Sequence, residues 1–159
     1  MNPARRLRQW RRLPSDSRRL LWLIFLALPL VALALRLLGY RRTLALVEHQ
    51  SRPKATRRPT SDDIAAGQHL ARLAAIAGRH GLVTATCLRQ ALLVHGLLRR
   101  RGLTPVLKLG VRRQGALPDM HAWVELGGVA LGQPVLAHTP FQSIAGQPTS
   151  QRTSAPSDD

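Results

Sequence analysis

Apolar and charged stretches alternate along the first third of the chain. Residues 20–35, LLWLIFLALPLVALAL, form an uncharged apolar run between Arg19 and Arg36, and Pro29 lies inside it. A membrane-spanning helix needs about 20 apolar residues, so this run is short for one. A helix that is apolar all round is otherwise buried against another helix or a partner. We favour the buried helix over the membrane-embedded one, and the pattern alone leaves both open.

Residues 49–60 separate this region from the rest of the chain. They contain two prolines and no apolar periodicity, which is typical of a linker. A helix is predicted directly after them, because Ser61 can cap its first turn and Asp62 and Asp63 complement the positive end of a helix. Its buried face is predicted from apolar side chains at helical spacing, which are Ile64, Leu70, Leu73, Ala74 and Ala77.

A second helix is predicted between a threonine cap and a glycine stop. Thr84 or Thr86 can cap it, Cys87 lies in its first turn, and Gly102 ends it. A cysteine at this position is typical of reactive thiols, because unpaired backbone amides and the helix dipole favour the thiolate. The apolar positions that mark its buried face are Leu88, Ala91, Leu92, Leu97 and Leu98.

The sequence after this helix predicts a small sheet. Residues 104–111 are rich in strand-forming residues, residues 120–126 alternate between two faces, and Gly127 and Gly128 form a hairpin turn into residues 129–131. The predicted fold class is therefore α+β, with a helix packed on a small antiparallel sheet and an apolar helix in front.

Four segments follow from these patterns. They are a basic and apolar N-terminal helical region (1–48), a linker (49–60), a core (61–144) and a disordered tail (145–159), whose polar composition cannot bury enough apolar area to fold.

Composition narrows the choice of partners. The chain has 24 Lys and Arg against 8 Asp and Glu, a formal net charge of +16, which indicates nucleic acid, anionic lipid or an acidic peptide. Most of these cations are arginines, which often reflects genome composition. With 4% aromatic residues, a stacking platform for single-stranded nucleic acid is not expected, and we expect no nucleic-acid partner. No metal-ligand spacing or phosphate-binding loop is present, so we expect no cofactor and no metal. One cysteine cannot form an internal disulfide.

Cys87 and His121 are the candidate catalytic pair. A strand histidine 34 residues after a cysteine at a helix start fits a thiol protease site, with the nucleophile on a helix and the base on the sheet behind it. The alternative is a core cysteine beside a structural histidine. Three other residues have simpler interpretations: His95 is a surface or core histidine, His138 is structural, and Trp123 is packed in the core beside the base.

The segments TCLRQALLVHGLLRRRGLTPVLKLGVRR, HAWVELGGVAL and TPF together resemble the lasso-peptide leader peptidases, which are transglutaminase-like (papain-like) cysteine proteases. The upstream helical region is also similar, so the resemblance covers about residues 5–144. It implies that Cys87 is the nucleophile, that His121 is its base, and that the substrate is a lasso precursor peptide. It also implies a split architecture, with a separate leader-recognition protein and a separate ATP-dependent lasso cyclase, because the first 48 residues lack the mixed helix and strand pattern of a recognition domain.

The third member of the site departs from this family. Gln133 stands where the family has an acid about twelve residues after the histidine, and no Asp or Glu lies between Glu125 and Asp158. An amide can orient a neutral histidine. A two-residue hairpin loop would place residue 134 opposite His121, and a three-residue loop with a bulge would place Gln133 there. Asp119 would need the second strand to start late, and Glu125 is about 13 Å along the strand from His121.

Localisation and rival functions remain open. We expect a cytoplasmic protein, with membrane association possible through residues 20–38 or docking of the cyclase there. A cleaved signal peptide is not favoured, because LRLLGYRR follows the apolar run in place of a small-x-small site. The rival functions are a basic membrane or nucleic-acid adaptor that does not need Cys87, and a degenerate protease fold that binds the precursor without cutting it.

Overall fold

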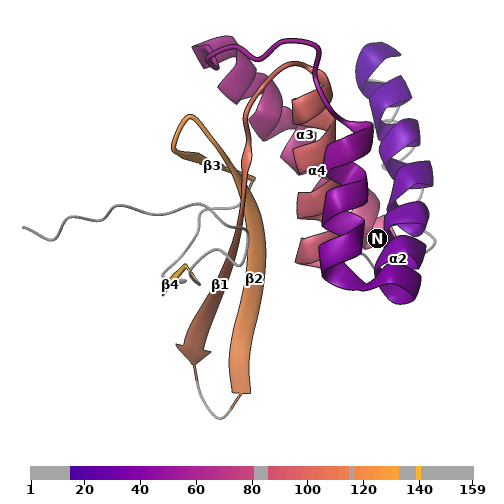
Figure 1. Cartoon of the computed structure of the whole chain (residues 1–159), viewed down its shortest axis with the longest axis vertical. Coiled ribbons are helices and arrows are strands. Elements are labelled where there is room, and N and C mark those ends of the chain that lie inside the picture. Colours follow the sequence, from indigo (N-terminus) through magenta and orange to yellow (C-terminus); the bar gives the residue numbers. More distant parts are fainter. Residues whose placement is uncertain (1–14, 81–85, 115–116, 133–138, 141–159) are drawn as a thin grey trace, which may run out of the picture.

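The computed structural model describes residues 15–80, 86–114, 117–132 and 139–140, and it has the predicted α+β architecture (Figure 1). Three helices gather on one side of a small antiparallel sheet. The helices are α2 (Ser15–Gln50), α3 (Ser61–His80) and α4 (Cys87–Arg100). The strands are β1 (Val106–Gln114), β2 (Leu117–Leu126), β3 (Val129–Leu131) and β4 (Thr139–Pro140).

The sheet has the order β3-β2-β1-β4, and every neighbouring pair is antiparallel. Gly127 and Gly128 join β2 to β3 with φ values of 59° and 80°, which a two-residue type I′ loop requires at both positions. Leu126 pairs with Val129 across this loop, so the predicted hairpin is confirmed in its two-residue form. β1 begins two residues later than predicted and continues to Gln114, and β2 begins three residues earlier, at Leu117.

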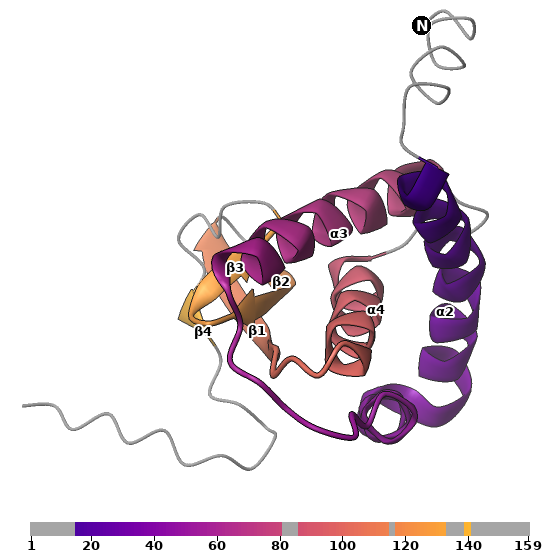
Figure 2. The ribbon, with the colours of Figure 1, turned by 90° about the horizontal axis from the view of Figure 1, so that it is seen from above.

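Helix α4 forms the centre of the core. Figure 2 shows it surrounded by α2, α3 and the sheet. Of its predicted buried face, Ala91, Leu92 and Leu98 are buried, and Leu88 and Leu97 are partly buried. Each fully buried Leu or Val contributes about 1.5–3 kcal/mol relative to an exposed one. The core residues of α3, α4 and the strands include Leu70, Leu73, Ala74, Ala77, Ala91, Leu92, Leu98, Val124, Leu126 and Leu131.

The apolar run of residues 20–35 packs on this core through one face only. Leu21, Ile24 and Leu28 are buried, and the Oγ of Ser17 lies 3.2 Å from the Nε2 of His69 on α3. The favoured interpretation, burial against another helix or a partner, is therefore confirmed for this face, and the opposite face is exposed in the single chain. Among the described helices, α2 is the one whose length and composition would allow it to cross a membrane.

Gly102 ends α4 as predicted and also anchors the segment between α2 and α3. Its φ of 77° and the hydrogen bond from the N–H of Leu103 to the carbonyl of Leu98 are features of a glycine-terminated helix. The carbonyl of Gly102 accepts from the N–H of Arg57 at 2.9 Å. This hydrogen bond holds residues 52–60, which contain no helix or strand, against the C-terminal end of α4.

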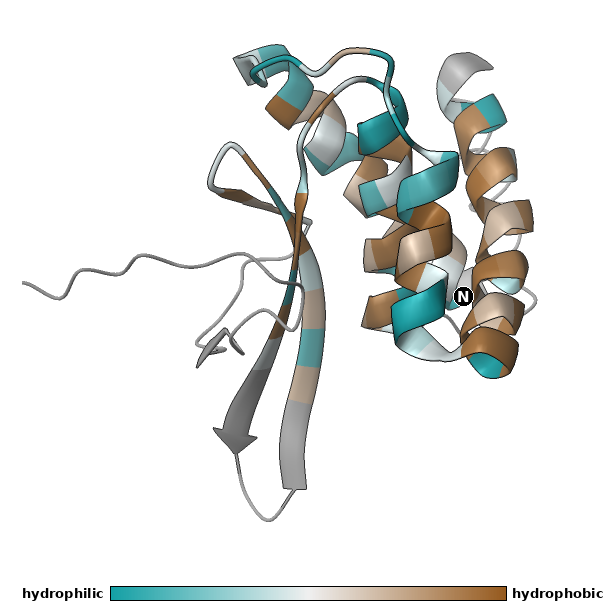
Figure 3. Cartoon of the chain, viewed as in Figure 1, coloured by the Kyte–Doolittle hydropathy of each residue, from teal (hydrophilic) through white to brown (hydrophobic). Residues whose placement is uncertain are grey.

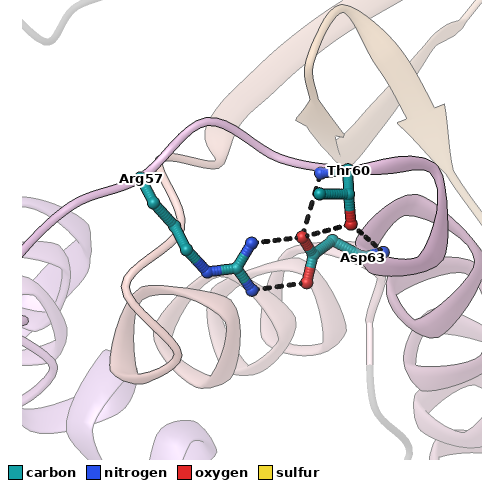
Figure 4. Close-up of polar contacts among 3 residues, drawn as sticks. All are labelled: Arg57, Thr60 and Asp63. Atoms are coloured by element: carbon teal, nitrogen blue, oxygen red, sulfur yellow. Dashed lines mark hydrogen bonds and ion pairs between the residues drawn. The ribbon is translucent and has the colours of Figure 1, made fainter.

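The first turn of α3 is capped by Thr60, and the prediction of Ser61 is wrong. The Oγ1 of Thr60 accepts from the N–H of Asp63 at 3.3 Å, and the N–H of Thr60 donates to the Asp63 carboxylate at 2.9 Å (Figure 4). This is a capping box, in which each side chain satisfies the other's backbone amide. Arg57 also donates to this carboxylate, and its hydrogen bonds and those of Thr60 hold the pKa of Asp63 well below its usual range. Ser61 already belongs to the helix, so it lies one residue too late to cap it.

Helix α2 changes direction at Gly39, as Figure 2 shows for the two parts of this helix. Gly39 has φ 73° and ψ 175°, a conformation that is essentially restricted to glycine. The buried Thr43 donates from Oγ1 to the carbonyl of Gly39 at 2.7 Å and stabilises the kink.

A Gly39→Ala variant is expected to lose about 1–3 kcal/mol of the free energy of unfolding. A Cβ at this position would meet nothing within 4 Å, so the loss comes from the backbone conformation alone. Urea denaturation followed by circular dichroism measures it, with the exposed neighbour Leu38→Ala as a control that changes stability by no more than about 0.5 kcal/mol. Equal midpoints for the two variants would contradict a kink that requires glycine.

Candidate active site

Cys87 is the first residue of α4, directly after Thr86. Thr86 has the extended backbone of an N-cap residue, although its side chain makes no capping hydrogen bond, and Thr84 lies outside the described residues. The half-buried thiol of Cys87 donates to the carbonyl of Met120 on β2 at 3.8 Å. Met120 immediately precedes His121, so the start of α4 lies against the strand that carries the predicted base.

His121 lies on β2 opposite Gly110 of β1. Its ring stacks on Trp123, with the ring centroids 6.1 Å apart and an angle of 17° between the planes. Trp123 is only 4% exposed, and its indole N–H donates to the Oε1 of Glu125 at 3.0 Å. The predicted core position of Trp123 is therefore confirmed, and the fixed indole supports one face of the imidazole.

Cys87 and His121 line one cavity of about 270 Å³. The cavity opens between α3, α4 and the sheet, and its wall is mainly small or aliphatic. The other residues that line it are Ala71, Ala75, Arg79, Gln90, Ala91, Val94, Ala122, Trp123, Val124, Leu131 and Gly132. A helix-borne thiol and a strand-borne imidazole facing one apolar cavity can perform nucleophilic attack on a carbonyl that enters it.

The carboxylate of Glu125 does not orient His121. The carboxylate of Glu125 accepts from Trp123 and lies 4.0 Å from the Nζ of Lys108, so it is directed to other partners. Asp119 lies within β2, paired with Arg112, and the late strand start that it would need is not found. Gln133 lies outside the described residues. The hairpin between β2 and β3 has a two-residue loop. Of the two loop lengths considered from the sequence, this is the one for which Gln133 is not expected directly opposite His121.

Gln68 of α3 supports this site and was not singled out from the sequence. Its Nε2 donates to the carbonyl of Ala130 at 2.8 Å, and its Oε1 accepts from the N–H of Gly132 at 2.9 Å. One side chain therefore binds the backbone at the end of β3, where Leu131 and Gly132 line the cavity. The preceding Gly67 allows this close approach, because a Cβ there would lie 3.0 Å from the Cδ1 of Leu131. The only signal in the sequence was a glycine followed by an amide inside an otherwise apolar helical pattern.

Two further polar side chains line the cavity without having been predicted. Gln90 lies one turn after Cys87 on α4, and Arg79 lies near the end of α3, where its Nε donates to the carbonyl of Ala75 at 3.3 Å. His138 lies outside the described residues, and His95 is a core histidine that is only 4% exposed. Within the described ranges, no group of three or more His, Cys, Asp or Glu residues is arranged to hold a metal ion.

Comparison with protein families matches residues 27–146 to the transglutaminase-like superfamily. The chain belongs to the transglutaminase-like superfamily. The match starts within α2 and includes Cys87, His121 and Gln133, and this superfamily includes cysteine proteases. The predicted fold, a transglutaminase-like core preceded by an apolar helix, is therefore confirmed. Comparisons with curated proteins and with solved structures gave no match.

Proposed function

We propose that this transglutaminase-like protein is a cysteine peptidase that removes the leader from a lasso-peptide precursor. The observation that carries the proposal is the placement of Cys87 and His121 on the wall of one cavity, at the start of α4 and on β2. The sequence resemblance described above supplies the substrate class. The aliphatic wall of the cavity supports it, because it suits a small side chain of the leader next to the cleaved bond.

The mechanism is acyl transfer to water. The Cys87 thiolate attacks the carbonyl carbon at the junction of leader and core, and the peptide C–N bond breaks as His121 gives its proton to the leaving amine. His121 then takes a proton from water, which attacks the thioester and releases the leader with a free carboxylate. The first backbone N–H groups of a helix lack intrahelical acceptors, so those at the start of α4 are suited to stabilise the oxyanion.

The proposal includes two partners. A separate leader-recognition protein presents the precursor, as the sequence resemblance implies. A separate ATP-dependent cyclase closes the ring after the leader is removed.

Gln133 is the proposed third member of the site, acting through its amide on the His121 ring.

Mass spectrometry of the precursor tests this function. The precursor from the same gene neighbourhood is co-expressed with its recognition protein and with either the native chain or its Cys87→Ala variant. We expect the native chain to release the leader and the variant to leave the precursor intact, a difference of at least about a thousandfold because the nucleophile is lost. Circular dichroism of both proteins shows whether the substitution leaves the fold unchanged.

Two other outcomes of this experiment would contradict the proposed peptidase activity of Cys87. Cleavage by both chains would mean that Cys87 is not the nucleophile. If neither chain cleaves, but the purified native chain binds the precursor, the transglutaminase-like core acts as a binding scaffold. No Asp or Glu lies between Glu125 and Asp158, where the resemblance leads us to expect an acid that orients His121. This absence is the observation that favours a binding scaffold as the second candidate function.

A further inference from the structure

The outer face of α2 carries a continuous apolar stripe. Six large apolar side chains of this helix are between 47% and 70% exposed. At 3.6 residues per turn they fall within an arc of about 100°, and the buried Leu21, Ile24 and Leu28 lie on the opposite side. The residues of the stripe are Trp22, Leu23, Leu26, Leu30, Leu33 and Leu37. Figure 3 shows how closely hydrophobic residues follow one another in this part of α2.

The size of the stripe indicates that something covers it. From Trp22 to Leu37 it runs for about 22 Å along the helix at 1.5 Å per residue. Scattered exposed leucines are normal on soluble proteins, but a contiguous apolar surface of this length marks an interaction site. Leu21, Ile24 and Leu28 already pack α2 against the core, so the stripe is not the face that this helix uses to pack on the rest of the chain.

Arginines border both ends of the stripe. Arg18 and Arg19 precede it, Arg36 lies beside its last turn, and Arg41 and Arg42 follow the kink. All five are exposed. Helix α2 holds two acidic residues, Asp16 and Glu48, against these five arginines, so its positive charge is only partly balanced within the helix. An apolar helix face bordered by arginines complements a surface that is apolar inside and negatively charged outside.

We infer that the stripe places the protein on the surface of an anionic lipid bilayer. The leucines would enter the region between headgroups and acyl chains, and the arginines would pair with the phosphates. Trp22 lies at one end of the stripe, edge-on to Phe25 with ring centroids 5.9 Å apart. Tryptophan favours this depth of a bilayer, because its ring is apolar and its N–H is polar. This inference does not depend on the proposed peptidase activity.

The helix lies along the membrane and does not cross it. Crossing would remove Leu21, Ile24 and Leu28 from their contacts with α3 and α4 and expose the core of the protein. A second copy of the chain is also disfavoured as the occupant. Packing two stripes against each other around a twofold axis would bring the arginine borders of both copies together, and α2 has more arginines than acidic residues to offset them.

Co-sedimentation of the full-length protein with vesicles tests the inference. Vesicles of phosphatidylglycerol and phosphatidylcholine in equal amounts are compared with vesicles of phosphatidylcholine alone. We expect the native protein to bind the anionic vesicles, with binding that weakens as salt is added. A Leu26→Gln, Leu30→Gln double variant should bind at least about tenfold more weakly, because two apolar contacts with lipid are lost.

The matched control is Val129→Gln, an exposed apolar residue of β3 at the far side of the molecule from α2 (Figures 1 and 2). It should bind vesicles as the native chain does. A second readout is tryptophan emission, which should shift to shorter wavelength on the anionic vesicles and lose most of this shift in Trp22→Phe. Circular dichroism confirms that each variant is folded.

Three results would overturn the inference. The first is no binding of the folded native protein to either kind of vesicle. The second is concentration-dependent dimerisation in sedimentation velocity that the double leucine variant abolishes, which would make the stripe an interface between copies. The third is equal binding to both vesicle types, which would remove the role of the arginines.

Discussion

Replacing His121 by alanine is expected to lower kcat/KM for leader removal by about 10²- to 10⁴-fold, which is the usual contribution of a general acid and base. Cys87 would lose the group that takes its proton, and the leaving amine would lose its proton donor. The substitution leaves a space beside Trp123, on which the imidazole ring is stacked. Added imidazole should therefore restore part of the activity of this variant and have no effect on Cys87→Ala.

His49→Ala is the matched control for this prediction. His49 is an exposed histidine in the last turn of α2 and does not line the cavity. It should retain the native rate, measured by mass spectrometry of the precursor over time. A His121→Ala variant that is folded and cleaves as fast as His49→Ala would remove His121 from the mechanism and leave Cys87 without an identified base.

A large pH dependence of stability is expected from His95, which lies on α4 and is only 4% exposed. Neither of its ring nitrogens has a hydrogen-bond partner among the described residues, and the nearest carboxylate oxygen, from Glu48 on α2, is 3.7 Å from Nε2. Burial and, to a lesser extent, the positive charge of Arg99 lower the pKa of His95 to about 4 from 6.5. The folded protein therefore keeps this histidine neutral where the unfolded chain would protonate it.

The direction of the effect follows from proton binding. At pH 7.5, one unit above the ordinary pKa of 6.5, both states carry an almost fully neutral histidine, and His95 adds little pH dependence. As pH falls from about 6.5 to 4, the unfolded chain binds a proton that the folded protein does not, so the free energy of unfolding decreases. The loss amounts to about 2 kcal/mol at pH 5 relative to pH 7.5.

A His95→Leu variant should lack this loss, because leucine fills a similar space and does not titrate. Urea denaturation of the native and variant proteins at pH 7.5 and pH 5 measures the difference, and the acidic residues common to both proteins cancel in the comparison. His49→Ala is again the control, since an exposed histidine should leave the native pH dependence unchanged. The same pH dependence in His95→Leu and the native chain would show that His95 is not held neutral by the fold.

The elements that could be predicted are those with a strong local pattern. Helices α3 and α4 and the β2 to β3 hairpin follow from helical spacing, a glycine stop and a Gly-Gly turn, all of which act within a few residues. The cap of α3 was placed one residue too late, because Thr60 and Ser61 are both good caps by residue type. Only the reciprocal hydrogen bonds between Thr60 and Asp63 distinguish them. Local residue types predict that a boundary exists, and three-dimensional contacts decide its exact residue.

The candidate site divides in the same way. Cys87 and His121 could be paired from the sequence, because a helix start and a strand that packs on it are each recognisable and carry one reactive residue. Gln68 could not be found, since its function depends on meeting the backbone of Ala130 and Gly132, more than 60 positions later in the chain. An ordinary surface amide and a positioning residue look the same until the opposing backbone is known.

The sequence by itself determined the α+β class, the helix that starts at Cys87, the strand that carries His121, and the apolar character of α2. The tertiary structure alone decided which faces of these elements meet. It buried Leu21, Ile24 and Leu28 and left Trp22 and Leu26 exposed, although all five belong to one uninterrupted apolar run. The physical reason is that hydropathy is a property of each residue, whereas burial depends on how many neighbours the rest of the chain brings to each face of the helix.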